Sequence, residues 1–184
     1  MSAELSAELA ELAGSIFADT ATAGAGMDTE PWKTLEGSGL ARLTLPEPAG
    51  GSGAALTDAA VVLSAAGAHA ARVPLVETDL LGGWLLHAAG IALPAGPLTA
   101  AVADREIGAG AVLTRVPWAR AVAGIAVLTP SRVVLLGLQD VRVTDGTNLA
   151  EEPRDGVEVT GSAAAAPAPE GAAAELRLRA ALGR

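Results

Sequence analysis

Few residue patterns in this 184-residue sequence could support chemistry by themselves. The stretch Gly50-Gly-Ser-Gly53 has the composition of a phosphate-binding loop, but no strand precedes it and no Gly-Lys-Ser/Thr follows it. His69 and His87 lie in apolar, helix-like segments without a carboxylate or nucleophile at a readable spacing. We therefore interpret the glycine-rich stretch as a flexible turn and the two histidines as packing or surface residues.

Acidic residues after Pro74 form the other cluster that could carry chemistry. Glu77 and Asp79 suit the first turn of a helix, where a carboxylate interacts favourably with the helix dipole. Trp32 and Trp84 recur at helical spacing from leucines and are most simply core residues. We expect structural roles for all four side chains.

Composition and charge narrow the classes of partner. The formal net charge is -9 and the isoelectric point is near 4.6, and the 12 Lys and Arg residues are scattered, which argues against nucleic-acid binding. There is no Cys, and the two His have no ligand spacing, so we expect no metal site. The N-terminus lacks a basic leader and no uncharged apolar run could span a membrane, so we predict a cytoplasmic protein with no membrane partner.

The apolar content predicts a thin core. Hydrophobic residues make up 51% of the chain, but much of that is alanine and only 2% of residues are aromatic. Alanine buries little apolar area per residue. In a small domain of this composition, the free energy gained by burial therefore only slightly exceeds the conformational entropy lost on folding. We therefore expect stabilisation by a partner subunit or by a further domain.

Helical periodicity dominates the N-terminal half. Over residues 2–18 apolar side chains recur every three or four positions, which predicts an amphipathic helix. The positions are Leu5, Leu9, Leu12 and Ile16. A short helix resumes at Pro31, and a further helix has one face marked by Leu56, Ala60, Leu63 and Gly67. Another is expected from Pro74 through Trp84 to near Gly90.

Beyond Pro97 the apolar period shifts towards two, which predicts antiparallel strands. The segments are Ala111–Val116, Gly124–Thr129, Arg132–Leu136, Val141–Thr144 and Val157–Thr160. The stretch from Ser162 to Gly171 is rich in Ala and Pro and is interpreted as a linker, and Ala172–Leu182 is expected to be helical. The predicted fold class is α+β: an N-terminal helical bundle, a small antiparallel β-barrel or sandwich domain, and the start of a C-terminal helix.

The order of these pieces resembles the acyl-CoA dehydrogenase family. Trp32–Leu40 and Leu45-Pro-Glu-Pro-Ala-Gly-Gly-Ser-Gly53 are similar to that family's pattern of Trp, Leu, a small residue and Gly, then Leu-Pro-Glu, a spacer and Gly-Gly-x-Gly. The segments similar to its following helices are Thr57–Leu63, Val73–Thr78 and Leu86–Gly90. The resemblance extends from about Leu5 to Leu182.

The resemblance implies a domain division and a candidate flavin edge. Residues 1–95 would form the helical domain, 96–162 the β-domain, and 163–184 a linker and the start of a truncated C-terminal helical domain. Val116-Pro-Trp-Ala-Arg120 resembles the strand that ends beside the flavin, so the candidate FAD-binding residues are Trp118, Ala119 and Arg120. For Arg120, a surface ion pair is an equally open interpretation.

Two features depart from the family. The usual Gln, Thr-Glu and Gly-Ser-Asp elements, which shape flavin and acyl-CoA contacts, have no clear counterpart in Leu98–Gly110. Ala119-Arg120 also stands where Ile-Thr or Ile-Ser is typical.

The implied activity is FAD-dependent α,β-dehydrogenation of acyl-CoA thioesters, as in fatty acid β-oxidation and other lipid metabolism. In that family a carboxylate removes the α-proton while the β-hydrogen leaves as hydride to N5 of FAD. In most members the base is a Glu of the C-terminal helical domain, so no catalytic residue is assigned to this chain.

Three hypotheses follow for the protein. We expect a subunit or fragment of such an oxidoreductase, inactive alone, in a homo- or hetero-oligomer with another acyl-CoA dehydrogenase-like subunit. The alternative is a non-catalytic partner subunit of a heteromeric acyl-CoA dehydrogenase. A third interpretation is an alanine-rich α+β protein unrelated to acyl-CoA chemistry.

Overall fold

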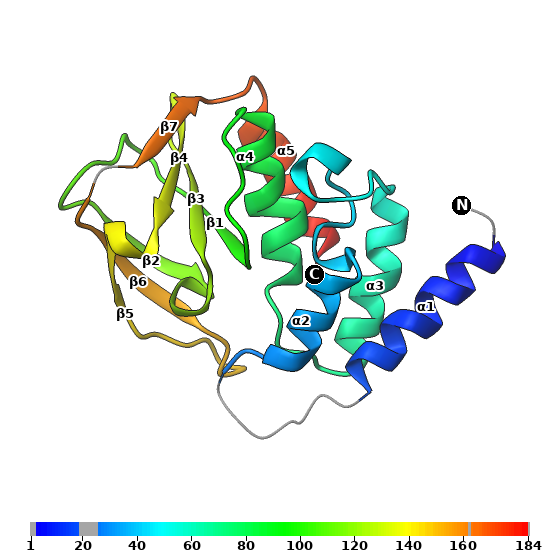
Figure 1. Ribbon diagram of the computed structural model, residues 1–184. Helices are drawn as coiled ribbons and strands as arrows, with labels where there is room; N and C mark the ends of the chain where they lie inside the picture. The colour runs from blue at the N-terminus through cyan, green and yellow to red at the C-terminus, as the bar shows by residue number, and fades with distance from the viewer. Residues whose placement is uncertain (1–2, 19–25, 162, 184) are drawn as a thin grey trace.

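Helices and strands occupy separate parts of the molecule in the computed structural model, which describes residues 3–18, 26–161 and 163–183 (Figure 1). The helical part contains α1 (Ala3–Phe17), α2 (Thr29–Gly37), α3 (Leu56–Ala68), the π-helical segment η3 (Val76–Gly83) and α4 (Trp84–Ala88). The C-terminal helix α5 (Ala172–Leu182) packs against η3. Short 3-10 turns are η1 (Leu40–Arg42), η2 (Glu47–Ala49), η4 (Ala119–Ala121) and η5 (Leu138–Asp140). The α+β fold class predicted from the sequence is confirmed.

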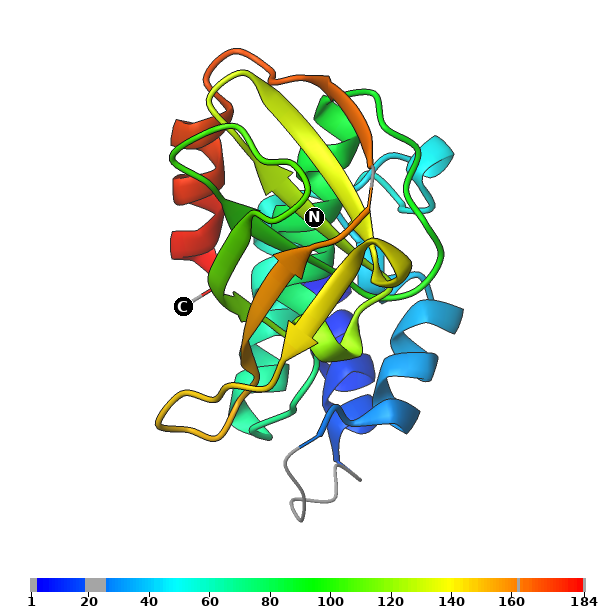
Figure 2. The ribbon, with the colours of Figure 1, turned by 90° about the vertical axis from the view of Figure 1, so that its left-hand side faces the viewer.

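The strands form two sheets that pack face to face (Figure 2). The four-stranded sheet has the order β1 (Leu98–Val102), β3 (Gly124–Leu128), β4 (Arg132–Gly137) and β7 (Ala164–Pro167). The three-stranded sheet has the order β2 (Val112–Pro117), β6 (Arg154–Val159) and β5 (Val141–Thr144). All five predicted strand regions are therefore β-structure.

One strand pair differs from the expected antiparallel arrangement. β1 runs parallel to β3, with Leu98 opposite Gly124, whereas the other strand pairs described are antiparallel. Parallel neighbours need a crossover connection. Here the crossover passes through β2, which belongs to the other sheet, so the chain returns to β1's side in the same direction.

The predicted Ala/Pro linker is also partly a strand. β7 pairs with β4 through Val133 opposite Ala166 and Arg132 opposite Pro167. Ala and Pro have low intrinsic strand propensity, but an edge strand tolerates a proline, and pairing with an existing neighbour overrides propensity. Residue 162, at the start of the predicted linker, lies outside the described residues.

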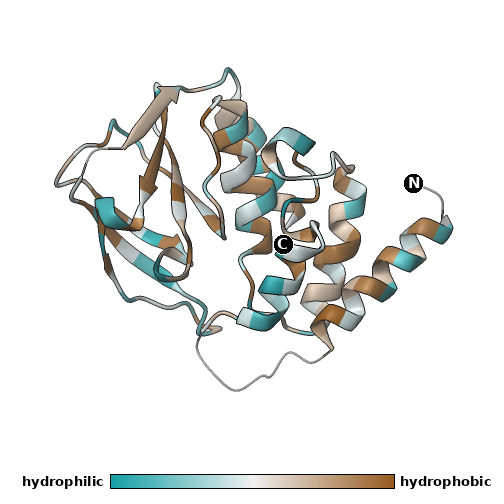
Figure 3. Cartoon of the chain, viewed as in Figure 1, coloured by the Kyte–Doolittle hydropathy of each residue, from teal (hydrophilic) through white to brown (hydrophobic). Residues whose placement is uncertain are grey.

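The buried face of α1 is shifted from the predicted one. Ala13 and Phe17 are completely buried, while Leu5 and Leu12 are 55% and 47% exposed. Figure 3 shows apolar and polar positions alternating along α1, which lies at one end of the molecule. Leu9 and Ile16 of the predicted face do pack against the core as partly buried residues. The buried face is therefore rotated from the predicted one, because the sequence does not reveal where α3 packs.

The buried face of α3 is shifted in the same way. Ala59, Val62 and Ala66 are buried, whereas Ala60 and Gly67, on the predicted face, are exposed. The sequence of α3 has small apolar residues on most of its faces, so its hydrophobic periodicity is weak. The neighbouring elements therefore decide which face is buried. Within the described ranges, no helix is both long and apolar enough to cross a membrane.

The helical and β parts are joined where η3 lies against β1. The buried Thr78 hydroxyl donates to the Leu98 carbonyl at 3.2 Å and accepts from the Leu98 amide at 3.0 Å. Gly82 brings the two backbones close, because a Cβ there would lie 2.7 Å from the Thr99 carbonyl oxygen. The expected helix from Pro74 onwards thus exists, but most of it is the π-helical segment η3, a rare form that occurs frequently at functional sites.

Asp79 lies in the first turn of η3 and has a structural role, as the sequence predicts, but it is buried. It is 3% exposed, and it accepts hydrogen bonds from the Thr44 amide at 3.0 Å and the Thr44 hydroxyl at 2.9 Å. Burial raises the pKa of Asp79 to about 6, against the lowering effect of the bonds from Thr44. This carboxylate therefore anchors η3 to the loop after α2.

We predict that Gly82→Ala destabilises the protein by about 1 to 3 kcal/mol, because the new methyl group overpacks the contact with β1. Gly67→Ala is the matched control, since a Cβ there meets nothing within 4 Å and alanine is the better helix former. Thermal or urea unfolding measures both variants. Equal stability of the two variants would contradict the close approach.

We predict that Asp79→Asn changes the pH dependence of stability. A buried acid whose folded pKa is raised from 3.8 to about 6 loses stability as pH rises between those values. The asparagine variant lacks this loss and keeps an acceptor for Thr44, so its stability relative to wild type should rise by up to about 3 kcal/mol between pH 4 and about 7. Urea unfolding across that range tests this, and a pH-independent difference between the two proteins would refute it.

Candidate functional site

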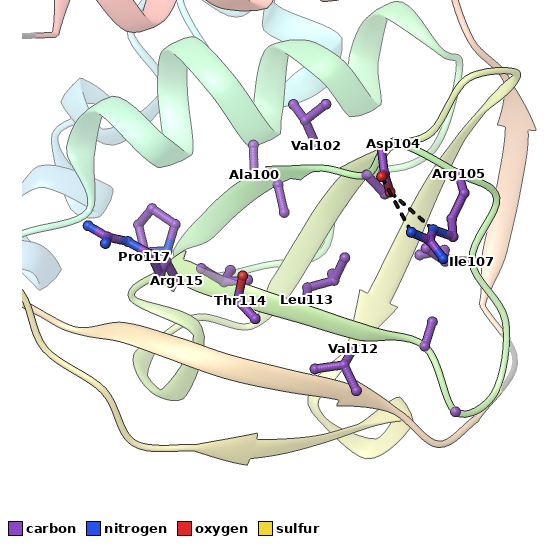
Figure 4. Close-up of a pocket in the computed structure, with 15 residues that line it drawn as sticks. Ala100, Val102, Asp104, Arg105, Ile107, Val112, Leu113, Thr114, Arg115 and Pro117 are labelled. Atoms are coloured by element: carbon purple, nitrogen blue, oxygen red, sulfur yellow. Dashed lines mark hydrogen bonds and ion pairs between the residues drawn. The ribbon is translucent and has the colours of Figure 1, made fainter.

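A cleft of about 800 Å³ lies between the edge strands β1 and β2 (Figure 4). Every residue that lines it falls between Ala100 and Pro117. Along β1 and just beyond it the side chains are small, from Ala100 to Ala103, so the cleft has room beside the strand. This chain therefore supplies the cleft through one continuous segment.

Charged side chains lie at the two ends of the cleft. Figure 4 shows Asp104 and Arg105 at one end and Arg115 beside Pro117 at the other. Asp104 and Arg105 form an exposed ion pair with 3.2 Å between Arg105 Nε and the carboxylate. The hydrogen bond and charge of Arg105 lower the pKa of Asp104. Arg115 has a φ of 58° at an irregularity in the pairing of β2 with β6.

A second cavity, of about 960 Å³, lies between the helical and β parts. Its walls come from α3, η3, the loop before β6, the end of β2 and the end of α5. The aliphatic wall is formed by residues such as Leu63, Val73, Leu75, Val76, Leu81 and Ala180. Pro117 lines both this cavity and the cleft, so both border the end of β2.

Backbone strain gathers around this second cavity. Four non-glycine residues with positive φ occur in the described ranges, and three of them, Ala70, Trp118 and Glu151, line the cavity. Their φ values are 48°, 56° and 60°. Such conformations are energetically unfavourable and persist where the surroundings enforce them, commonly at binding sites. The cavity is therefore the stronger candidate for a ligand site on geometric grounds.

Glu77 brings a carboxyl group to the cavity wall. Its pKa is raised, first because of burial and also by the charge of Glu152, while its own backbone amide and the charge of Arg154 oppose the rise. Arg154 bonds to Glu152 at 3.2 Å and to the Pro153 carbonyl at 2.8 Å. The cation opposite Glu77 is thus already engaged.

Arg120 is the centre of an ion network within the β part. Its backbone amide and its Nε each lie 2.9 Å from the Asp155 carboxylate, and one terminal nitrogen also bonds to Asp155. The nitrogen that bonds to Asp155, Nη2, also donates to the Gly146 carbonyl at 2.6 Å. The other terminal nitrogen, Nη1, lies 3.0 Å from the Asp145 carboxylate. All three guanidinium nitrogens therefore have partners inside this chain.

The partner of Arg120 is fully buried. Asp155 is 0% exposed and also accepts from the Gly146 amide at 3.1 Å. Burial alone would raise the pKa of Asp155, but the hydrogen bonds from Arg120 and Gly146 outweigh it and the pKa is lowered. The network fixes the loop after β5 to the turn after β2.

The structure places the three sequence-predicted flavin residues at the end of β2. Trp118 is 3% exposed and borders the second cavity, Ala119 is completely buried, and Arg120 points into its ion network. None of the three lines the cleft between β1 and β2. Sequence reasoning missed Glu77 as a cavity residue and Asp155 as the partner of Arg120, and no pattern in the sequence pairs Arg120 with a residue 35 positions away.

No group of three or more His, Asp or Glu residues in the described ranges could hold a metal ion. His69 Nδ1 lies 2.9 Å from the Ala65 carbonyl within α3, and its ring packs 6.5 Å from that of Phe17. His87 is exposed near the end of α4. Neither imidazole lines the cleft or the second cavity.

No protein-family model and no curated protein matches the sequence. Solved structures do match. The ChsE4-ChsE5 complex from Mycobacterium tuberculosis superimposes with a TM-score of 0.76 at 19% identity, over 95% of this chain and 60% of that chain. A glutaryl-CoA dehydrogenase from Mycobacterium smegmatis in complex with FADH2 gives a TM-score of 0.76 at 10% identity, over 100% of this chain and 61% of that one. This chain has the acyl-CoA dehydrogenase fold.

A third similar structure is that of a steroid acyl-CoA dehydrogenase (ACAD). A variant of the Tcur3481-Tcur3483 steroid ACAD gives a TM-score of 0.72 at 22% identity, over 98% of this chain and 60% of that chain. The chain thus spans about 60% of the length of the acyl-CoA dehydrogenase chains that it matches. The family resemblance predicted from the sequence is therefore confirmed at the level of the fold.

We predict that Arg120→Ala destabilises the protein by about 3 kcal/mol or more, because it leaves the buried Asp155 carboxylate without its cation. Asp145→Asn is the control, since Asp145 is 78% exposed and its pair with Arg120 is worth about 1 kcal/mol or less. Denaturant unfolding measures both. If the two variants lost the same small stability, Arg120 would be an ordinary surface cation.

Proposed function

We propose that this chain is a subunit, or a segment of a subunit, of an FAD-dependent acyl-CoA dehydrogenase acting in lipid metabolism. The observation that carries the proposal is the likeness of fold over 95% to 100% of the chain in several enzymes of that class. On this proposal residues 1–95 are the helical domain, 96–162 the β-domain and 163–184 the approach to a further helical domain. The general base is supplied from outside these residues.

An oligomer is part of the proposal. One of the matched structures is a complex of ChsE4 with ChsE5, and that complex is what this chain is similar to. The cleft between β1 and β2 is lined by residues of a single segment, from Ala100 to Pro117. A dry, enclosed flavin needs a wall on each side, so we propose that the second wall comes from another subunit or from a further domain.

The cleft fits the ring system of a flavin better than it fits the charged part of FAD. Small side chains from Ala100 to Ala103 leave room for a flat ring, for which FAD would supply hydride acceptance. The Arg120 guanidinium cannot also bind a diphosphate unless it gives up its buried partner, Asp155. We therefore propose that Trp118, Ala119 and Arg120 support the flavin edge by fixing the end of β2. Arg115 is then a cation available to the ligand, and Arg105 becomes one if it exchanges its exposed ion pair with Asp104.

The second candidate function is that of a non-catalytic partner subunit in a heteromeric acyl-CoA dehydrogenase. It is favoured by one observation: between Ala100 and Ala103 the cleft has no hydrogen-bonding side chain. A subunit of this kind would lend surface to the assembly while another chain held the flavin. The two candidates differ in whether this chain contributes to FAD binding.

The test is an FAD titration of the purified chain, followed by flavin absorbance and fluorescence, before and after mixing with a second acyl-CoA dehydrogenase-type chain. We expect saturable binding only in the mixture, because this chain supplies one wall of the cleft. Saturable binding by the chain alone would show that the second wall is unnecessary. If the mixture bound no more FAD than the second chain alone and showed no change in acyl-CoA dehydrogenation, both candidate functions would be wrong.

Arg120 gives a sharper version of this test in the flavin-containing assembly. Arg120→Ala should lower the FAD retained by about 10-fold, because the end of β2 loses its anchor to Asp155. Arg120→Lys keeps the charge but not the forked geometry, so its loss should be intermediate. Unchanged flavin content in the folded Arg120→Ala assembly would remove this residue from the flavin edge.

A further inference from the structure

Glu77 lies on the cavity side of η3 because its neighbours are held elsewhere. Thr78 is bonded to Leu98 of β1, and Asp79 is bonded to Thr44. These contacts fix the rotation of η3 about its axis. Glu77, one position earlier, lines the cavity between the helical and β parts and is only partly buried. The contacts that hold the fold together thus also set the position of this carboxyl group.

The carboxyl group of Glu77 has no side-chain partner among the described residues, whereas the other charged groups around the cavity are mostly engaged. Arg154 bonds to Glu152, and Arg72 bonds to Asp28. Glu151 remains at the rim, where it is exposed. Most of the cavity wall is aliphatic. The Glu77 carboxyl group accepts a hydrogen bond from its own backbone amide. A ligand that brings a further hydrogen bond to this partly buried group, on an otherwise mostly aliphatic wall, gains affinity.

The surroundings select the kind of group that Glu77 can bind. A ligand carboxylate would face Glu77, Glu151 and Glu152 and be repelled. A cationic group would meet Arg154, and it would require Glu77 to ionise in a place where burial opposes ionisation. A purely apolar ligand would displace water from the Glu77 carboxyl group without replacing the hydrogen bonds of that water, and so would bind less tightly. A neutral hydroxyl satisfies the carboxyl group in either protonation state.

We infer that Glu77 is a specificity-determining residue, and that the cavity binds a bulky, mostly apolar group whose hydroxyl forms a hydrogen bond with the Glu77 carboxyl. On the proposed function, on which this assignment of substrate class rests, that group is the acyl part of a hydroxylated acyl-CoA. The shared position of Pro117 agrees with this, since the cavity opens beside the cleft assigned to the flavin.

The experiment measures selectivity on the full chain with two pairs of probes. The first pair is dodecanol and its methyl ether. The ether cannot donate a hydrogen bond, and neither compound needs a CoA-binding site. The second pair is ω-hydroxylauroyl-CoA and lauroyl-CoA, measured on the chain and on its flavin-containing assembly. Displacement of an apolar fluorescent dye gives the affinities, and thermal unfolding confirms that each variant is folded.

Wild type should bind the hydroxylated member of each pair about 10-fold more tightly, the discrimination typical of one hydrogen bond to a partly buried carboxyl group. Glu77→Leu should bind both members equally. Glu77→Gln should keep most of the preference within the thioester pair, because an amide oxygen still accepts from a hydroxyl, but should discriminate less between dodecanol and its ether, because its NH2 group can donate to an ether oxygen. Glu151→Gln is the matched acidic control at the rim and should behave as wild type.

Equal affinity for dodecanol and its ether in wild type, no binding of either, or a preference that survives Glu77→Leu would overturn the inference. The CoA pair separates this result from the proposed function. If the dodecanol preference depends on Glu77 but neither thioester binds to the chain or the assembly, the cavity assignment stands and the acyl-CoA function fails. If both thioesters bind equally, the function stands and the role of Glu77 fails.

Discussion

The close contact between η3 and β1 is the constraint on which the rest of this structure depends. Thr78 provides both a donor and an acceptor to the backbone of Leu98, and Gly82 has no side chain to separate the helix from Thr99. An alanine-rich chain buries little area per residue, so a backbone-to-backbone approach is an efficient way to attach a helix to a sheet edge. A buried cluster next to this contact, in which Leu85 and Leu86 of α4 pack with residues of the four-stranded sheet, then holds the helical part and the β part together.

Both hollows of the molecule follow from that contact. On one side of β1, small residues leave the cleft towards β2 open. The same docking also turns Glu77 and the aliphatic residues of η3 towards the second cavity. The π-helical geometry and the positive φ of Trp118 and Glu151 are local costs, tolerated because the surrounding packing and hydrogen bonds enforce them.

Ion pairs and hydrogen bonds fix the end of β2, which borders both the cleft and the second cavity. Asp155 is completely buried and would be unstable as an ion without Arg120, which bonds to it through its backbone and its side chain. Asp79 is the opposite case, since its partner Thr44 is neutral and its pKa remains raised. Arg120 therefore acts within the β part, which explains why a permanently charged residue can follow a buried tryptophan.

The sequence predicted the elements better than their faces. Helices, five strand regions and the C-terminal helix were readable from periodicity, and the segments around Trp32 and Gly50–Gly53 indicated the fold family. The buried faces of α1 and α3 were predicted only in part: Leu9, Ile16 and Leu63 pack against the core. Leu12 and Ala60 are exposed, because they satisfy helical spacing as well as the buried alanines next to them do. The strands β1 and β7 are not among the predicted strands. In the case of β7, pairing with β4 and not its own composition makes the segment a strand.

By itself, then, the sequence determined the α+β class, the order of the elements and the family resemblance, since these depend on local period, turn residues and short motifs. The tertiary structure alone decided that Arg120 pairs with Asp155, that β1 runs parallel to β3, and that Glu77 reaches a cavity while Asp79 is buried. The reason is physical: each of these depends on contacts between residues far apart in the chain, and local propensity contains no information about which distant partner will be met.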